Sequence, residues 1–133
     1  MLFDNLFDRF KAPTDLAGRV LLSLIFIVAG YSKIGGYAGT AGYMESAGVP
    51  GELLPLVILA ELGGGIAILL GLFTRPVAVA LAGFSVISGV IFHGAPDQVN
   101  QIMLMKNIAI AGGFLVLAAN GAGAWSIDAK LQK

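Results

Sequence analysis

The feature that most constrains the fold is a run of 21 residues, Leu53 to Phe73, that is apolar except for one acid, Glu61. A helix needs about 20 such residues to cross the hydrocarbon core of a bilayer, which is about 30 Å thick. An ionised side chain at the centre of a spanning helix costs about 2.5–3.5 kcal/mol. Each Leu, Ile, Val or Phe in the helix offsets this cost by a few tenths of a kcal/mol. We therefore expect a membrane span whose buried acid has either a partner or a function.

The composition supports a membrane protein. The chain is 57% hydrophobic and only 12% charged, whereas soluble domains are about one quarter charged. Its main partner should therefore be the lipid bilayer. The formal net charge of zero argues against a nucleic-acid partner, which would need excess Lys and Arg. Because no cysteine is present, thiolate metal ligands and dithiol redox chemistry are excluded, and we expect no metal site.

Hydropathy and turn residues predict an all-α integral membrane protein, an antiparallel bundle of four transmembrane helices in one domain covering residues 1–133. A short amphipathic helix over residues 2–11 should lie in the interface, because its phenylalanines fall on one face, and Pro13 should end it. Residues 35–52 are more polar than the expected spans and predict a turn or short surface helix. The expected spans are residues 16–34, 53–73, 77–93 and 102–122.

The distribution of Lys and Arg predicts the orientation. Six of these residues fall at one end of the expected bundle and two at the other, and the end with more positive charge faces the cytoplasm. We therefore expect a bacterial inner-membrane protein with both termini in the cytoplasm. The six are Arg9, Lys11, Arg19, Arg75, Lys130 and Lys133, and the two are Lys33 and Lys106.

Each expected span places a polar group in the outer half of the bundle. Glu61 lies about 12 Å from the outer end of its helix, at 1.5 Å per residue. A mid-depth acid is by default functional, so Glu61 is the candidate proton acceptor. The alternative is a structural ion pair with Lys33 or Lys106. The candidate ligand-binding residues are Glu61, Lys33, His93, Lys106 and Asn107.

A second polar group is expected at the inner end. Arg19 and Lys33, Glu61 and Arg75, and Lys106 and Asn120 are each fourteen residues apart, close to four helical turns. This spacing predicts that three helices each turn a stripe with polar ends into the bundle. Asp128, just past the fourth span, is the expected counter-ion of Arg19 or Arg75. These three residues are predicted to form structural ion pairs.

Taken together, these segments resemble the DoxX family of small bacterial four-helix inner-membrane proteins along essentially the whole chain. The resemblance implies the four-helix fold. It also implies an association with quinone-linked oxidation of sulfur compounds, or with oxidant defence, as the membrane partner of a soluble enzyme. The segments that carry it are Gly18-Arg19, Ala29-Gly30 through Lys33, Gly48-Val49-Pro50, Glu61-Leu62-Gly63-Gly64-Gly65, Gly71 to Arg75, His93, Lys106-Asn107, Gly112-Gly113, and Gly121 to Gly123 leading into Ser126-Ile127-Asp128.

The favoured hypothesis is a redox-linked subunit that binds a quinone or similar lipophilic head group in the outer half of the bundle. No autonomous catalytic motif is present and no intrinsic cofactor is expected, so electrons would come from a soluble or membrane redox partner. The main alternative is a non-catalytic anchor or assembly factor for a soluble enzyme. A proton or small-solute transporter ranks third, because nothing resembles broken helices or an inverted repeat. A homo-oligomer is compatible with each hypothesis.

Overall fold

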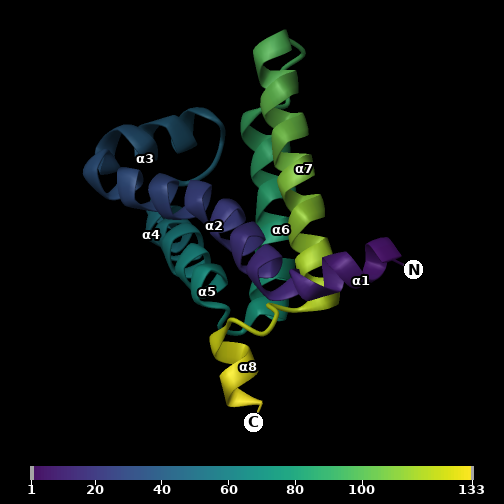
Figure 1. The fold of residues 1–133 in the computed structure, drawn as a ribbon. Helices are drawn as coiled ribbons and strands as arrows, with labels where there is room; N and C mark the ends of the chain where they lie inside the picture. The colour runs from purple at the N-terminus through teal and green to yellow at the C-terminus, as the bar shows by residue number, and fades with distance from the viewer. Residues whose placement is uncertain (1, 133) are drawn as a thin grey trace.

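The computed structural model describes residues 2–132, so Lys133 of the expected inner charge group lies outside the described residues. The described chain is helical throughout, with short connecting turns (Figure 1). In chain order the elements are α1 (Leu2–Arg9), α2 (Lys11–Gly35), α3 (Tyr37–Ser46), the 3-10 turn η1 (Gly51–Leu53), α4 (Leu54–Ile58), the π-helical turn η2 (Leu59–Gly63), α5 (Gly64–Leu70), α6 (Thr74–Phe92), α7 (Gln98–Asn120) and α8 (Ile127–Leu131).

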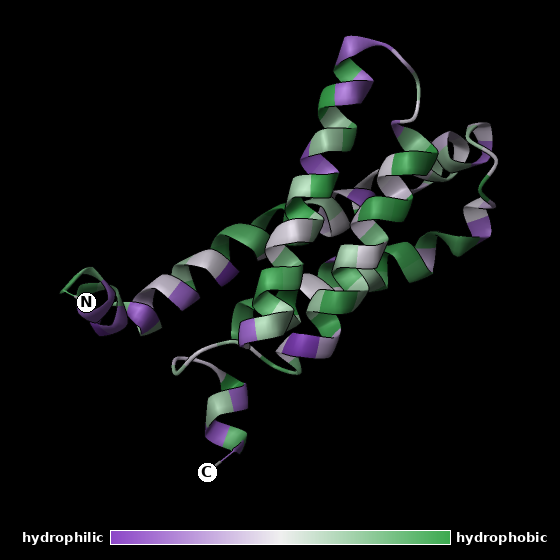
Figure 2. Cartoon of the chain, turned by 90° about the vertical axis from the view of Figure 1, so that its right-hand side faces the viewer, coloured by the Kyte–Doolittle hydropathy of each residue, from purple (hydrophilic) through white to green (hydrophobic). Residues whose placement is uncertain are grey.

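Four of these segments are long and apolar enough to cross a membrane, which agrees with the predicted all-α membrane fold. They are α2, the combined segment Gly51–Leu70, α6 and α7. We call Gly51–Leu70, which runs through η1, α4, η2 and α5, the second span. Hydrophobic residues cover the spans, and hydrophilic residues gather at their ends and in α1 and α8 (Figure 2).

The boundaries differ from the predicted ones where local backbone chemistry decides them. The first break falls at Phe10, and α2 continues through Pro13. A proline is tolerated there because the N–H groups of the first helical turn have no partner within the helix, so the missing N–H of proline breaks no hydrogen bond. The second span ends at Leu70 and not at Phe73, since Gly71 adopts a left-handed conformation with φ 69°. The last long helix begins at Gln98, where the Asp97 side chain accepts a hydrogen bond from the Asn100 amide.

The spans pack as two antiparallel pairs, α2 against the second span and α6 along α7 (Figure 1). Between the pairs lies an apolar core that includes Phe26, Ile68, Leu81 and Phe114. The rings of Phe26 and Phe114 meet edge to face with centroids 5.4 Å apart, the geometry that aromatic quadrupoles favour. Both termini lie at the same end of the bundle, the end where α5 turns into α6 (Figure 1).

Helix α1 lies beside the bundle, at the end that holds the termini (Figure 1). None of its described residues is buried, and Phe3 and Phe7 are each 70% exposed. A helix with exposed aromatic rings on one face and charges on the other lies in the plane of the headgroup region. The residue range and the exposure therefore agree with the predicted interfacial helix.

The second span is not a regular α-helix. Residues Leu59–Gly63 form a π-helical turn that contains Glu61. Such single-turn widenings of a helix are rare and occur often at functional sites. The extra residue in the turn changes the direction in which the side chains after Ile58 leave the helix. The turn therefore sets the face on which Glu61 lies.

Two glycines bring α2 against the second span. A Cβ atom on Gly30 would lie 2.8 Å from the backbone nitrogen of Leu62, and one on Gly65 would lie 3.2 Å from the backbone nitrogen of Ile27. Lipid tails are as apolar as the side chains, so membrane helices gain no hydrophobic free energy by packing against each other. The van der Waals contacts that form when two backbones approach closely stabilise the pair instead. The contact at Gly30 adjoins Glu61 and fixes the spacing of the helices there.

Replacing Gly30 by alanine should therefore separate these helices. We expect Gly30→Ala to lower the free energy of unfolding by about 1–2 kcal/mol, as overpacking outweighs the gain in helix propensity. Gly18→Ala on the same helix is the matched control. No atom lies within 4 Å of its added Cβ, so it should be neutral or slightly stabilising. Thermal unfolding of the two purified proteins in detergent compares them, and equal midpoints would contradict the close contact.

Candidate functional site

A cavity of about 350 Å³ lies between α2, α3, the second span and α6. Most of its lining is apolar or aromatic. The polar side chains among the lining residues are Lys33, Thr40, Tyr43, Glu61, Ser88 and His93. An apolar pocket with a few convergent polar groups is the usual form of a small-molecule site.

An ion pair between Lys33 and Glu61 lies at this cavity. The Lys33 Nζ and Glu61 Oε1 atoms are 2.7 Å apart, and the Glu61 side chain is only 8% exposed, whereas that of Lys33 is 27% exposed. Lys33 stands one turn after Gly30 on α2, and Glu61 stands next to Leu62, which Gly30 touches. The close helix contact and the π turn together bring the two charges within reach. The acid in the membrane thus has a cationic partner.

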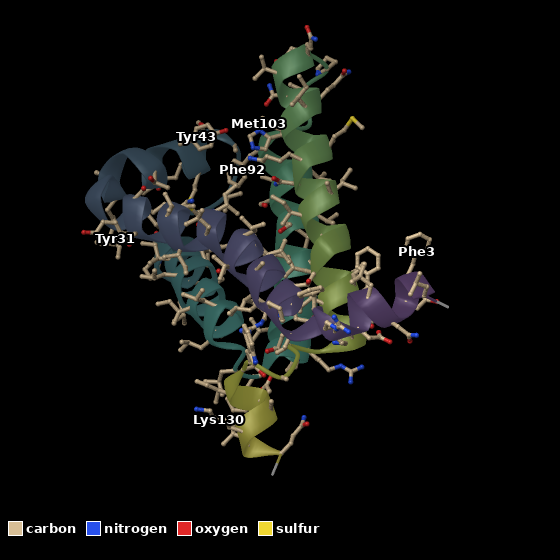
Figure 3. All side chains as sticks on the ribbon, in the orientation of Figure 1. Phe3, Tyr31, Tyr43, Phe92, Met103 and Lys130 are labelled. Carbon is tan, nitrogen blue, oxygen red and sulfur yellow. The ribbon has the colours of Figure 1, made fainter. Side chains whose placement is uncertain are left out.

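Helix α3 covers the outer side of the cavity. The Tyr43 ring stacks on that of Phe92, the last residue of α6, with centroids 5.4 Å apart and planes 22° from parallel (Figure 3). Met44 is buried beside them and holds the end of α3 through a hydrogen bond from the Val49 amide to its carbonyl oxygen. The cavity therefore has an aromatic wall contributed by two separate elements.

His93 lines the same cavity from the end of α6 and is held by Asn100 in the first turn of α7. Its Nδ1 lies 3.1 Å from Asn100 Oδ1, and Asn100 Nδ2 donates to Asp97 Oδ1 at 2.6 Å. The hydrogen bonds from Asn100 hold the pKa of Asp97 below its usual value. A chain of polar groups thus connects the cavity to the loop at this end of the bundle.

The other two predicted ligand-binding residues lie elsewhere. Asn107 Nδ2 donates to the Ser85 carbonyl oxygen at 3.1 Å, which ties α7 to α6 behind the cavity wall. Lys106 is exposed on α7 and makes no ion pair within 4 Å of any described acid. Of the five predicted residues, the structure brings Lys33, Glu61 and His93 together at the cavity. It leaves Asn107 behind them and Lys106 outside.

At the inner end, Arg19 differs from its predicted role. Its side chain is buried, with 1% of the residue exposed, but it forms no ion pair with Asp128. Instead its guanidinium donates to the carbonyl oxygens of Ile68 at 3.2 Å and Leu69 at 2.8 Å, and to that of Trp125. The carbonyls at a helix C-terminus have no partner within the helix, so they compete successfully for a nearby cation.

Asp128 also binds backbone rather than a cation. Its two carboxylate oxygens accept hydrogen bonds from the amides of Phe73 at 2.8 Å and Thr74 at 2.9 Å, at the start of α6. A carboxylate is favoured at a helix N-terminus, where amides lack partners and the helix dipole is positive. Burial raises the pKa of Asp128, but these amides and the nearby Arg19 charge outweigh it and hold the pKa below its usual value.

Arg75 completes this pattern, because it too binds backbone. Its side chain donates to the carbonyl oxygens of Ala118 at 2.6 Å and Ala119 at 3.2 Å, near the end of α7. The predicted pairing of Glu61 and Arg75 on one helical face is not formed, since the helix ends at Leu70 and Arg75 belongs to α6. The predicted stripe on α7 faces outward, as both Lys106 and Asn120 are exposed.

Sequence reasoning missed two parts of the site. Phe92 and the π turn are not expected from the sequence, although Tyr43 falls within residues 35–52, for which a turn or short surface helix is predicted. The only signal for the π turn is the run of three glycines after Glu61, which is unusual within a membrane helix. The Tyr43–Phe92 stack depends on how α3 folds back over α6, which no local pattern encodes.

Comparison with known proteins identifies relatives that cover most of the chain. A protein-family model described as DoxX matches residues 14–94. "Inner membrane protein YqjF" of Escherichia coli K12 is 54% identical over 119 residues, which cover 89% of this chain and 92% of that protein. "Inner membrane protein YphA" of the same organism is 40% identical over 121 residues, covering 85% and 86%. "Putative oxidoreductase CatD" of Bacillus subtilis 168 is 39% identical over 64 residues, 48% of each chain. No solved structure matches this chain.

Proposed function

This chain belongs to the DoxX family of inner-membrane proteins, and we propose that it is a redox-linked subunit whose cavity binds a quinone or a similar lipophilic head group. The observation that carries the proposal is the cavity itself, in which aromatic and aliphatic walls enclose the Lys33–Glu61 pair and His93. A quinone ring matches such walls. Its oxygen atoms need hydrogen-bond donors, and the Lys33 ammonium is one donor at this cavity.

The position of the cavity suits a ligand that arrives through lipid. Ile87 and Ile91 line the cavity, yet they are 61% and 43% exposed on the outer surface of α6. In a bilayer this surface meets the acyl chains, so this wall of the cavity borders the lipid. A ligand with an apolar tail would enter there and leave its tail in the lipid.

Electron exchange would require a partner. The chain has one histidine and no cysteine, so it offers neither a histidine pair for haem nor a dithiol. The name of the Bacillus subtilis relative, "Putative oxidoreductase CatD", supports a redox role for the present chain. The proposed role is therefore that of a quinone-binding subunit working beside a separate redox protein.

A membrane anchor for a soluble enzyme is the second candidate. The observation that favours it is the C-terminal helix α8, which projects from the end of the bundle (Figure 1) and is fixed there by Asp128. Such a helix could present a rigid surface to a partner. The anchor needs no ligand in the cavity, so filling the cavity separates the two candidates.

The test compares two neighbouring substitutions in the second span. Val57 lines the cavity, and Leu56 is 62% exposed toward lipid. Val57→Phe should weaken binding of a short-chain quinone at least about tenfold, or about 1.4 kcal/mol, because the ring occupies the space of the ligand. Leu56→Phe should bind as the unchanged protein does. Titration of the purified proteins, with quinone analysis of their lipid extracts, measures this.

An unchanged protein that neither carries nor binds a quinone would contradict the proposal and favour the anchor. Equal binding by the Val57→Phe variant would show that the quinone occupies another surface. Complementation of a deletion strain by both variants would also favour the anchor.

We also propose that both termini face the cytoplasm. Arg9, Lys11, Arg75 and Lys130 lie at the end of the bundle that holds both termini, and Lys33 and Lys106 lie toward the other end. Since positively charged loops are retained in the cytoplasm, a C-terminal reporter that works only there should be active. Activity of a reporter that works only in the periplasm would overturn this orientation.

A further inference from the structure

The loop between α6 and α7 fixes the protonation pattern of the histidine at the cavity. Asp97 is an exposed carboxyl that is ionised at neutral pH, and its hydrogen bonds with Asn100 lower its pKa further. An ionised carboxylate only accepts hydrogen bonds, so the Asn100 amide must turn its NH₂ group toward Asp97. The oxygen of the same amide then faces His93 Nδ1, at 3.1 Å.

An amide oxygen accepts hydrogen bonds, so His93 Nδ1 must carry a hydrogen in this arrangement. The neutral imidazole has one hydrogen, and its other nitrogen, Nε2, is then a free acceptor. No described residue makes a hydrogen bond to Nε2. His93 thus contributes to the cavity wall a proton acceptor whose tautomer is set from outside the cavity.

Glu61 is less suited to that role. Its Oε1 atom is already paired with the Lys33 ammonium at 2.7 Å, and taking a proton from a ligand would neutralise one member of this buried ion pair. The two charges cancel each other at their side of the cavity, where Lys33 can donate to a ligand oxygen. The cavity then presents a cationic donor and, at His93, an acceptor.

We propose that His93 accepts the hydrogen bond of a ligand hydroxyl, so that the cavity prefers a hydroquinone to the corresponding quinone while the imidazole is neutral and loses this preference once the imidazole is protonated. This rests on the proposed quinone-binding function. A hydroquinone oxygen carries a hydrogen that Nε2 can accept. A quinone oxygen only accepts, so it needs the hydrogen that Nε2 gains on protonation.

Few other groups that face His93 and the cavity can change charge. Asp97 acts through Asn100 on α7, and Glu61 on the second span pairs with Lys33 of α2. Tyr43 on α3 stacks on the neighbouring Phe92. Imidazole is the side chain that ordinarily exchanges protons near neutral pH. The ratio of the two affinities should therefore follow His93.

The experiment measures binding of durohydroquinone and duroquinone to the purified full chain in detergent, without oxygen, at about pH 6 and about pH 8. In the unchanged protein the preference for the hydroquinone should rise about tenfold between the two, the equivalent of one hydrogen bond gained or lost. His93→Gln should abolish this shift, since an amide donates and accepts at both pH values. Glu61→Gln should weaken both affinities and retain the shift.

Asn100→Ala tests the control of the tautomer without touching the cavity. Freed from Asn100, the imidazole can carry its hydrogen on Nε2, so the preference for the hydroquinone at the higher pH should fall severalfold. The matched control is Gln101→Ala, because Gln101 follows Asn100 in the exposed first turn of α7 and its side chain bonds the Pro96 carbonyl oxygen instead of His93. Its preference should not change. Thermal unfolding of each variant confirms that it is folded.

Two failures are distinguishable. If the unchanged protein binds both forms but their ratio does not depend on pH, or if His93→Gln retains the shift, the role of His93 is overturned and the quinone site remains. If the shift disappears in Glu61→Gln and persists in His93→Gln, Glu61 is the proton acceptor. If neither form binds at any pH, the proposed function fails, and the inference fails with it.

Discussion

Replacing Arg19 by leucine is expected to lower the free energy of unfolding by about 3 kcal/mol. The carbonyl oxygens of Ile68, Leu69 and Trp125 lose the guanidinium together. The Ile68 oxygen keeps the Gly71 amide as a donor. Each unsatisfied acceptor costs about 1–3 kcal/mol, and removing the buried guanidinium returns part of the sum. The third acceptor belongs to the C-terminal segment, so this segment should also detach from the turn that follows α5.

Unfolding of the purified protein in detergent, with proteolysis of the C-terminal segment as a second readout, measures this effect. Arg9→Leu is the matched control, because Arg9 is exposed on α1 and its loss should change stability by less than about 0.5 kcal/mol. Arg19→Lys should recover only part of the loss, since one ammonium lacks the planar fork that reaches three carbonyls. An Arg19→Leu protein as stable as the control would contradict the bridging role.

The second large effect is expected from separating Lys33 and Glu61. Lys33→Met should lower the free energy of unfolding by about 3 kcal/mol, because it leaves without a partner a carboxylate that is only 8% exposed. Glu61→Gln should cost less, about 1–2 kcal/mol, because the Lys33 side chain is 27% exposed and its long stem can carry the ammonium toward the interface. The double variant should regain most of this stability, since it buries no unpaired charge.

The same variants separate a functional pair from a structural one. If the double variant regains stability but still fails to bind a quinone, the charges serve the ligand. If it regains both, the pair only holds the helices together. Costs that simply add in the double variant would show that the two charges do not interact, which would contradict the ion pair.

Much of the fold follows from local pattern. Runs of about 20 apolar residues define the spans, because hydrocarbon leaves no other way to satisfy the backbone. The amphipathic pattern of α1, and the even number of spans that puts both termini at one end, are likewise properties of the sequence. Helix ends were predicted less well, because they depend on single residues such as Asp97 and Gly71, whose side chain or backbone conformation decides the cap.

The candidate site was predicted only in part. A costly acid in the membrane needs a partner, and that reasoning led to Glu61 and to Lys33 as one of its two expected partners. It could not exclude Lys106, because the depth of a residue says nothing about which side of its helix faces the bundle. It also placed Arg75 on the helix of Glu61, although a left-handed glycine ends that helix first.

Composition and length are enough to predict that this protein spans a membrane four times and that its buried charge must be compensated, because transfer into lipid is favourable for long apolar segments and costly for ions. The packing of the helices selects the groups that provide the compensation. The close approach at Gly30 and the π turn bring Glu61 to Lys33, and the folding of α3 over α6 closes an aromatic wall beside them. At the inner end, helix termini offer backbone groups in fixed positions, so Arg19 and Asp128 bind these and not each other. Such choices depend on distance and direction between segments far apart in the chain, which only the packed structure specifies.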